Sequence, residues 1–225
     1  MCNVAKCKTM DELFTCWKGA HNENMTKLPN GIGNMSFAPD GIICNEKYFG
    51  TNTRVLFIAK ECNLSSLAYM NPICADGKSF WLQSVLDDPT IPRSRAGSRF
   101  VNSLSTLYNA LKAYRQGQHA DVCTDNEPLK EIAYINLNKR GGKSTSKYYI
   151  LESYVKYYQE YLRKQIQLID ASLIVCCGND VKRLVDNYHL CDGMRIVTVS
   201  HPSDNFVSYD ANIKNLEEEL AKLLY

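Results

Sequence analysis

Short, continuously apolar runs alternate with longer amphipathic segments from residue 51 to the end of the chain. Four runs rich in β-branched residues predict strands, at residues 55–59, 132–137, 172–178 and 194–200. Continuous apolar runs of this length are typical of parallel strands that are covered on both faces. Apolar residues spaced by three and four predict helices, at residues 98–114, 151–169, 179–188 and 210–225.

Strands separated by helices of this length imply βαβ crossovers and a parallel sheet with helices on both faces. We therefore expect an α/β fold, a three-layer α/β/α sandwich around a central four-stranded parallel sheet. The length of 225 residues suits a single domain over residues 1–225. Within it, residues 1–50 form an N-terminal helix (residues 10–20) and a Gly/Pro/Asn-rich connector, and residues 51–225 form the α/β core.

The composition is that of an ordinary globular protein, with 45% apolar and 22% charged residues. It excludes a collagen-like, coiled-coil or disordered chain. The apolar runs fall far short of the roughly twenty residues that a membrane span needs. The N-terminus also lacks the apolar core of a secretory signal. We therefore expect a cytoplasmic protein with no membrane partner.

The ten cysteines include no CxxC pair, whereas the usual zinc and iron–sulfur sites need closely spaced thiolates. We expect most of them to be free, small, buried hydrophobic residues, and we predict no metal site. One alternative stays open, a cluster of Cys2, Cys7 and Cys16 with a distant partner. An iron–sulfur or redox protein is the corresponding alternative function.

Polar side chains follow each predicted strand, and the carboxyl ends of parallel strands meet at one edge, where ligands bind. In chain order they are Glu61 and Asn63, Asn136 and Asn138, Asn179 and Asp180, and His201 and Ser203. Together with a cationic glycine loop after the second strand, they predict a site for a phosphate-bearing substrate with a polar heterocycle.

That loop, KRGGKSTSK, ends like a phosphate-binding P-loop, but Leu137 stands where the motif requires its first glycine. We expect it to contact phosphate through backbone amides and Lys143 instead. Residues 136–164 contain seven basic and two acidic residues, and Arg93, Arg95 and Arg99 form a second basic group. Such patches can bind a polyanion, although a solvated surface is the alternative.

The order of these motifs resembles that of the uracil-DNA glycosylase superfamily. Residues 59–63 (AKECN) stand in the register of the family's first motif, directly after the first strand. Asn136 matches the Asn that ends the second strand, and His-Pro-Ser at residues 201–203 matches the last motif. Residues 77–80 resemble the family's Gly-x-x-Phe. The similarity spans residues 37–203 and is closest to divergent bacterial members, which carry FxPDG and a Lys-Glu pair, as SFAPDGI and IAKE do here.

The chain departs from the family pattern at three points. The first motif has Ala59 and Cys62 in place of its Gly and Pro, and Glu61 in place of its Asp. The leucine that wedges into duplex DNA is absent after His-Pro-Ser, where this chain offers Phe206. The CxxC pair of the branch that holds a four-iron cluster is also missing.

The resemblance implies an enzyme that hydrolyses the N-glycosidic bond of uracil or a related base in DNA. It assigns catalysis to Glu61 and His201, and base binding to Asn136, Asn63 and a stacking Phe80. Asn138 is a rival for Asn136 as the base reader. The implied DNA contacts are those of Lys139, Arg140, Lys143, Ser144, Ser203 and Phe206.

The expected partner is single- or double-stranded DNA, with no cofactor and no obligate protein partner. A non-catalytic DNA- or nucleotide-binding module on the same fold is the alternative function.

Overall fold

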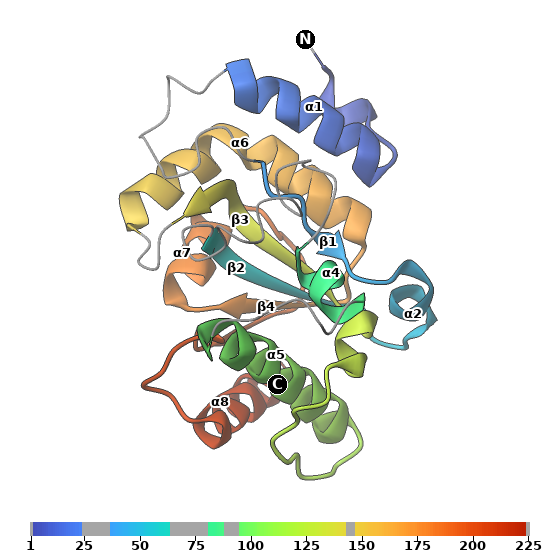
Figure 1. The fold of residues 1–225 in the computed structure, drawn as a ribbon, viewed down its shortest axis with the longest axis vertical. Helices are drawn as coiled ribbons and strands as arrows, with labels where there is room; N and C mark the ends of the chain where they lie inside the picture. The colour runs from blue at the N-terminus through green and yellow to red at the C-terminus, as the bar shows by residue number, and fades with distance from the viewer. Residues whose placement is uncertain (1, 24–36, 64–80, 88–94, 143–146, 224–225) are drawn as a thin grey trace.

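A five-stranded sheet runs through the centre of the computed structural model, which describes residues 2–23, 37–63, 81–87, 95–142 and 147–223 (Figure 1). The strands have the spatial order β1-β3-β2-β4-β5. Their bounds are β1 (Gly41–Ile42), β2 (Val55–Asn63), β3 (Ala133–Gly142), β4 (Leu173–Cys177) and β5 (Ile196–Val199). Strands β2 to β5 pair in parallel, and β1 pairs antiparallel with β3.

The predicted alternation and the mostly parallel sheet are confirmed, but the sheet has five strands instead of four. The additional strand, β1, contains only two residues, which is too short to produce a hydrophobic pattern. Two predicted strands also continue further than expected, β2 to Asn63 and β3 to Gly142. Glu61 and Asn138 therefore lie opposite each other within the paired strands.

Helices cover both faces of the sheet (Figure 1). On one face lie α5 (Arg95–Arg115), α8 (Tyr209–Lys222) and α4 (Trp81–Asp87). On the other lie α1 (Met10–Glu23), α6 (Tyr148–Ile169) and α7 (Asn179–Asn187). The short elements are η1 (Val4–Lys6), α2 (Asn45–Gly50) and η3 (Glu127–Glu131). No helix in the described part of the chain is long and apolar enough to cross a membrane.

The alternation along β2 decides which polar residues reach which face. Val55, Phe57 and Ala59 pack in the core under α5 and α8, whereas Leu56 and Ile58 pack under α6. Because side chains alternate between the faces of a strand, the next two residues also separate. Glu61 continues the α5 side, and Lys60 continues the side of α6 and α7.

A buried ion pair fastens the edge of β3. Lys139 Nζ contacts Asp40 Oδ1, and the two side chains are 0% and 1% exposed. Asp40 also accepts bonds from the Asn136 backbone N–H at 2.7 Å and from Gln165 Nε2 on α6 at 3.0 Å. The ammonium group lies 5.3 Å from the ring of Trp17 on α1. Burial lowers the pKa of Lys139, and the Asp40 carboxylate opposes this shift.

Removing one partner of this pair should destabilise the fold strongly, because it leaves an uncompensated buried charge. We expect Asp40→Asn and Lys139→Met each to lower the free energy of unfolding by about 3–5 kcal/mol, measured by urea denaturation. The control is Asp186→Asn in the exposed Lys182–Asp186 pair, which should cost less than about 1 kcal/mol. A cost for Asp40→Asn no larger than that of the control would contradict the role assigned to the pair.

Candidate functional site

His201 follows β5, and its hydrogen bonds fix the tautomer of the neutral ring. Nδ1 accepts the backbone N–H of Ser203 at 3.3 Å, and the Ser203 hydroxyl oxygen lies 2.9 Å from the same nitrogen. Because a backbone N–H can only donate, Nδ1 carries no proton here and the proton of the neutral imidazole is on Nε2. The ring therefore offers Nε2–H as a donor to a ligand.

The surroundings of His201 keep the imidazole neutral. Burial, and then the Lys60 cation, lower the pKa of His201 from 6.5 to about 4, whereas the Asp204 carboxylate opposes them. His201 and Lys60 share a cavity of about 490 Å³ at the carboxyl ends of the strands. The first turn of α7 contributes Asn179 to the cavity wall. The cavity thus combines a neutral donor with one cation, Lys60, and two carboxylates, Asp204 and Glu219.

Glu61 and Asn138 are bonded to each other across β2 and β3. Asn138 Nδ2 donates to Glu61 Oε2 at 2.9 Å, and Asn138 Oδ1 accepts the backbone N–H of Arg140 at 2.9 Å. The neighbouring Lys60 instead forms an ion pair with Asp180 on α7, at 2.8 Å. The amide of Asn138 therefore orients the carboxylate that the sequence singles out for catalysis.

Asn136 is also held through both ends of its amide. Its Oδ1 accepts the hydroxyl of Tyr134 at 2.9 Å, and its Nδ2 lies 3.5 Å from Asp40 Oδ2. The residue is only 1% exposed. The two candidate base readers thus differ in their supports, because Asn136 is held by the buried Asp40 network and Asn138 by Glu61.

Two aromatic residues that the sequence does not single out link His201 to β3. The ring centroid of Phe100 on α5 lies 6.2 Å from that of His201 and 5.5 Å from that of Tyr134. The sequence pattern assigns Phe100 only to the apolar face of the predicted helix at residues 98–114. The contacts place His201, Tyr134 and Asn136 on the α5 side of the sheet, together with Glu61. One intervening strand, β4, sets the backbones of β2 and β5 about 10 Å apart.

The loop after His-Pro-Ser presents Phe206, whose residue surface is 99% exposed. Arg99 on α5 holds this loop, because its Nη2 donates to the carbonyls of Asp204 at 2.8 Å and Val207 at 2.6 Å. Sequence reasoning placed Arg99 only in a basic group and missed this role. The ring of Phe206 is thus displayed to solvent on a loop that is fastened to the core.

Two predicted phosphate contacts do not agree with the structure. Lys139 and Arg140 are 0% and 2% exposed, and both use their charged groups internally. Arg140 Nε donates to His21 Nε2 at 3.2 Å, and Lys139 pairs with Asp40. Ser203 is partly exposed beside His201.

Three predicted site residues, Phe80, Lys143 and Ser144, lie outside the described residues, as does the side chain of Asn63.

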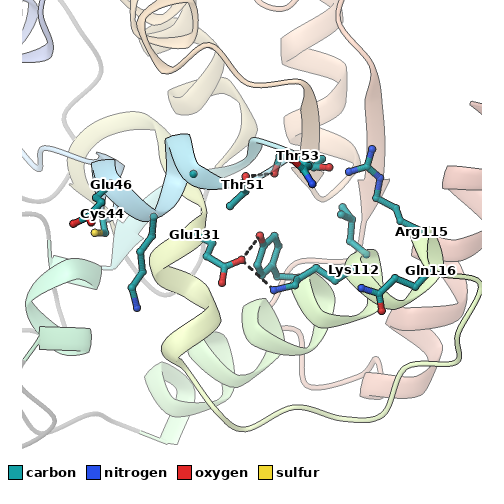
Figure 2. A pocket seen from close by; sticks show the side chains of 13 residues that line it. Cys44, Glu46, Thr51, Thr53, Lys112, Arg115, Gln116 and Glu131 are labelled. Carbon is teal, nitrogen blue, oxygen red and sulfur yellow. Dashed lines mark hydrogen bonds and ion pairs between the residues drawn. The ribbon is translucent and has the colours of Figure 1, made fainter.

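A second cavity, of about 770 Å³, lies at the opposite end of the sheet, where Thr51 and Thr53 precede β2 (Figure 2). In it Glu131 points toward Lys112, whose Nζ lies 3.1 Å from Glu131 Oε2. The Tyr108 hydroxyl donates to the same oxygen at 2.9 Å. Lys112 and Glu131 therefore pair with each other, and the cavity is remote from the carboxyl ends of the strands. The edge with His201 and Glu61 is therefore the candidate site.

Comparison of the sequence with protein-family models finds no match, and neither does comparison with curated proteins. The function is therefore inferred from the site itself, which offers an N–H donor, a held carboxylate and two amides. Among the described residues, the His, Cys, Asp and Glu side chains grouped closely enough to hold a metal are elsewhere, at Cys2, Cys7 and Cys16.

The protonation state of His201 can be measured by NMR titration of the imidazole rings. Folding lowers its pKa from 6.5 to about 4, so the ring should stay neutral from about pH 8 to pH 5 with the proton on Nε2. Because the ring of the unfolded chain binds a proton more tightly than the ring of the folded protein, the free energy of unfolding should fall as the pH drops below about 6.5. Titration of His201 near 6.5, or a proton on Nδ1, would contradict the assignment.

Proposed function

We propose that the protein is a DNA glycosylase that hydrolyses the N-glycosidic bond of uracil or a related damaged base. The observation that carries the proposal is the neutral His201, with its donor nitrogen at the sheet edge that also holds Glu61. The resemblance of the first and last motifs to the uracil-DNA glycosylase superfamily supports the same activity.

The reaction separates a sugar cation from a base anion, and the enzyme must stabilise both in the transition state. His201 Nε2–H would donate to the base carbonyl oxygen, where negative charge develops as the bond breaks. A neutral imidazole is suited to this role because it is a donor already in place. Removing one such donor typically costs about 10²–10³ in rate.

Glu61 would act on the sugar side of the bond. Its carboxylate can offset the developing positive charge and orient the attacking water. The hydrogen bond from Asn138 Nδ2 holds the carboxylate in place before substrate arrives. Such preorganisation favours the transition state because no reorientation is needed during the reaction.

Asn136 would read the base edge once substrate binding uncovers its amide, which is 1% exposed in the free protein. An amide offers a donor and an acceptor that complement uracil. The Tyr134 hydroxyl and the Asp40 carboxylate fix which end of the amide is oxygen and which is nitrogen. Each end keeps capacity for one further hydrogen bond. Asn138 is the rival reader, and its bond to Glu61 would then couple base recognition to the carboxylate.

A base inside a duplex must be extruded before it can be cleaved, and apolar side chains often fill the gap that it leaves. The exposed Phe206 is the candidate for this role. Ser203, beside His201, is the candidate contact for a flanking phosphate.

Base release from uracil-containing oligonucleotides tests the proposal. Glu61→Gln and His201→Gln should each lower the single-turnover rate by about 100-fold or more. The first removes the carboxylate that offsets the sugar cation, and the second removes the Nε2–H donor positioned for the base anion. Matched controls are Glu127→Gln and His119→Gln, at exposed positions away from the site, which should leave the rate unchanged.

The proposed glycosylase activity would be contradicted if the wild type released none of four bases from single or double strands, namely uracil, hypoxanthine, xanthine and hydroxymethyluracil. Salt-dependent DNA binding without release would instead point to the binding module. The burial of the Asn136 amide, which is 1% exposed, is the observation that favours that alternative, because it keeps the proposed base reader away from a base.

The role of Phe206 predicts a difference between substrates. Phe206→Ala should slow release from double-stranded DNA by about tenfold or more, because unstacking costs a few kcal/mol per step. Release from single strands should be nearly unaffected. Phe49→Ala is the matched control, since Phe49 is also exposed but lies on α2, away from the candidate site. An equal loss of rate on double- and single-stranded DNA would contradict the role of Phe206 in filling the gap left by the extruded base.

A further inference from the structure

Three cysteines converge at the start of the chain. Cys2 and Cys7 flank η1, and Cys16 lies on α1. Their Sγ atoms all lie within 4.8 Å of one another. Cys2 and Cys16 form a disulfide, and Cys7 Sγ lies 3.6 Å from Cys16 Sγ.

The fold, and not the spacing along the sequence, creates this cluster. The turn of η1 reverses the chain, with the Cys7 N–H bonded to the carbonyl of Val4 at 3.1 Å. Cys7 is only 5% exposed, whereas Cys2 is exposed and Cys16 is partly buried. Three sulfur atoms, two of them joined in the disulfide, thus meet at one point of the protein surface.

The spacing of one sulfur pair, Cys7 and Cys16, fits a single metal ion. Zinc–sulfur bonds are about 2.3 Å long, so two sulfurs on one tetrahedral zinc lie about 3.8 Å apart. The Cys7–Cys16 separation of 3.6 Å is close to this value. In a four-iron cluster each thiolate binds a different iron atom, which spreads the sulfurs farther apart.

We propose that Cys2, Cys7 and Cys16, in their reduced form, bind one Zn²⁺ ion and leave its fourth position to solvent or a small ligand. Thiolates select soft or borderline metals such as zinc over magnesium or calcium. Among the described residues, no fourth His, Cys, Asp or Glu joins the group. The site is separate from the proposed DNA chemistry.

The disulfide and the metal site are two states of the same sulfurs. A thiol reductant of the glutathione class breaks the Cys2–Cys16 bond, which yields two protein thiols while two reductant molecules become one disulfide. The three thiols then lose three protons as three Zn–S bonds form, so the zinc and its thiolates carry a net charge of −1. Metal binding therefore requires reduction and weakens at low pH.

Zinc would fasten the first residues to α1. In that helix, Trp17 packs over the Lys139 ammonium group, and His21 accepts a hydrogen bond from Arg140. The ion would therefore hold in place the helix that covers these two buried cations. Binding to the folded state should raise stability, because the site does not exist in the unfolded chain.

The test is a zinc titration of the full chain under reducing conditions, in competition with a chromophoric chelator. We expect one equivalent of tightly bound zinc, and visible tetrahedral cobalt–thiolate bands when Co²⁺ replaces it. Cys2→Ser, Cys7→Ser and Cys16→Ser should each weaken binding by about tenfold or more. Cys44→Ser and Cys123→Ser, at free cysteines outside the cluster, are the matched controls.

Because Cys2 is exposed, Cys2→Ser should fold even if Cys7→Ser does not. Zinc should raise the Tm of the wild type and of Cys44→Ser, but not that of Cys2→Ser. Sub-stoichiometric binding, equal affinity in Cys2→Ser and wild type, or iron–sulfur absorption in purified protein would each overturn the proposal. A disulfide that persists under reducing conditions and blocks zinc would also overturn it.

Discussion

The buried charge pair between Lys139 and Asp40 ties together β3, the segment before β1 and helix α6. An unpaired charge at this depth would cost several kcal/mol, so the chain must bring the two groups together to fold. Asp40 precedes β1, Lys139 lies on β3, and Gln165 of α6 bonds the same carboxylate. The pair therefore fixes one sheet edge relative to the helix layer above it.

The same network reaches the candidate site through β3. Asp40 accepts the backbone N–H of Asn136 and lies beside its amide, so the buried carboxylate also orients a proposed base reader. Two residues further along, Asn138 holds Glu61. One strand thus combines a structural ion pair on one side with the polar groups of the site on the other. A defect in the pair should consequently disturb the site as well as stability.

In the part of the chain that the structure describes, the sequence predicts the alternating strands and helices well because each has its own periodicity. Strands β2 to β5 and helices α1, α5, α6, α7 and α8 follow from it. It does not reveal contacts between distant residues. Lys139 and Arg140 look like a solvated basic run beside two glycines, and only Asp40, 99 residues away from Lys139, explains a buried lysine. Arg99 similarly holds a loop 105 residues away. The two-residue β1 leaves no local pattern either. The sequence left a cluster of Cys2, Cys7 and Cys16 open as an alternative, and the fold of η1 against α1 brings their sulfurs together.

A crystal structure with DNA that contains a fluorinated, uncleavable deoxyuridine would test most directly whether His201 and Glu61 bind an extruded base. If His201 and Glu61 act as proposed, the base is extruded and its carbonyl oxygen lies at hydrogen-bond distance, about 2.7–3.2 Å, from His201 Nε2. Glu61 then faces the sugar. We also expect that the Lys139–Asp40 pair stays buried beneath the bound base. A base bound at the amino ends of the strands, or a His201 ring turned away from it, would contradict the account.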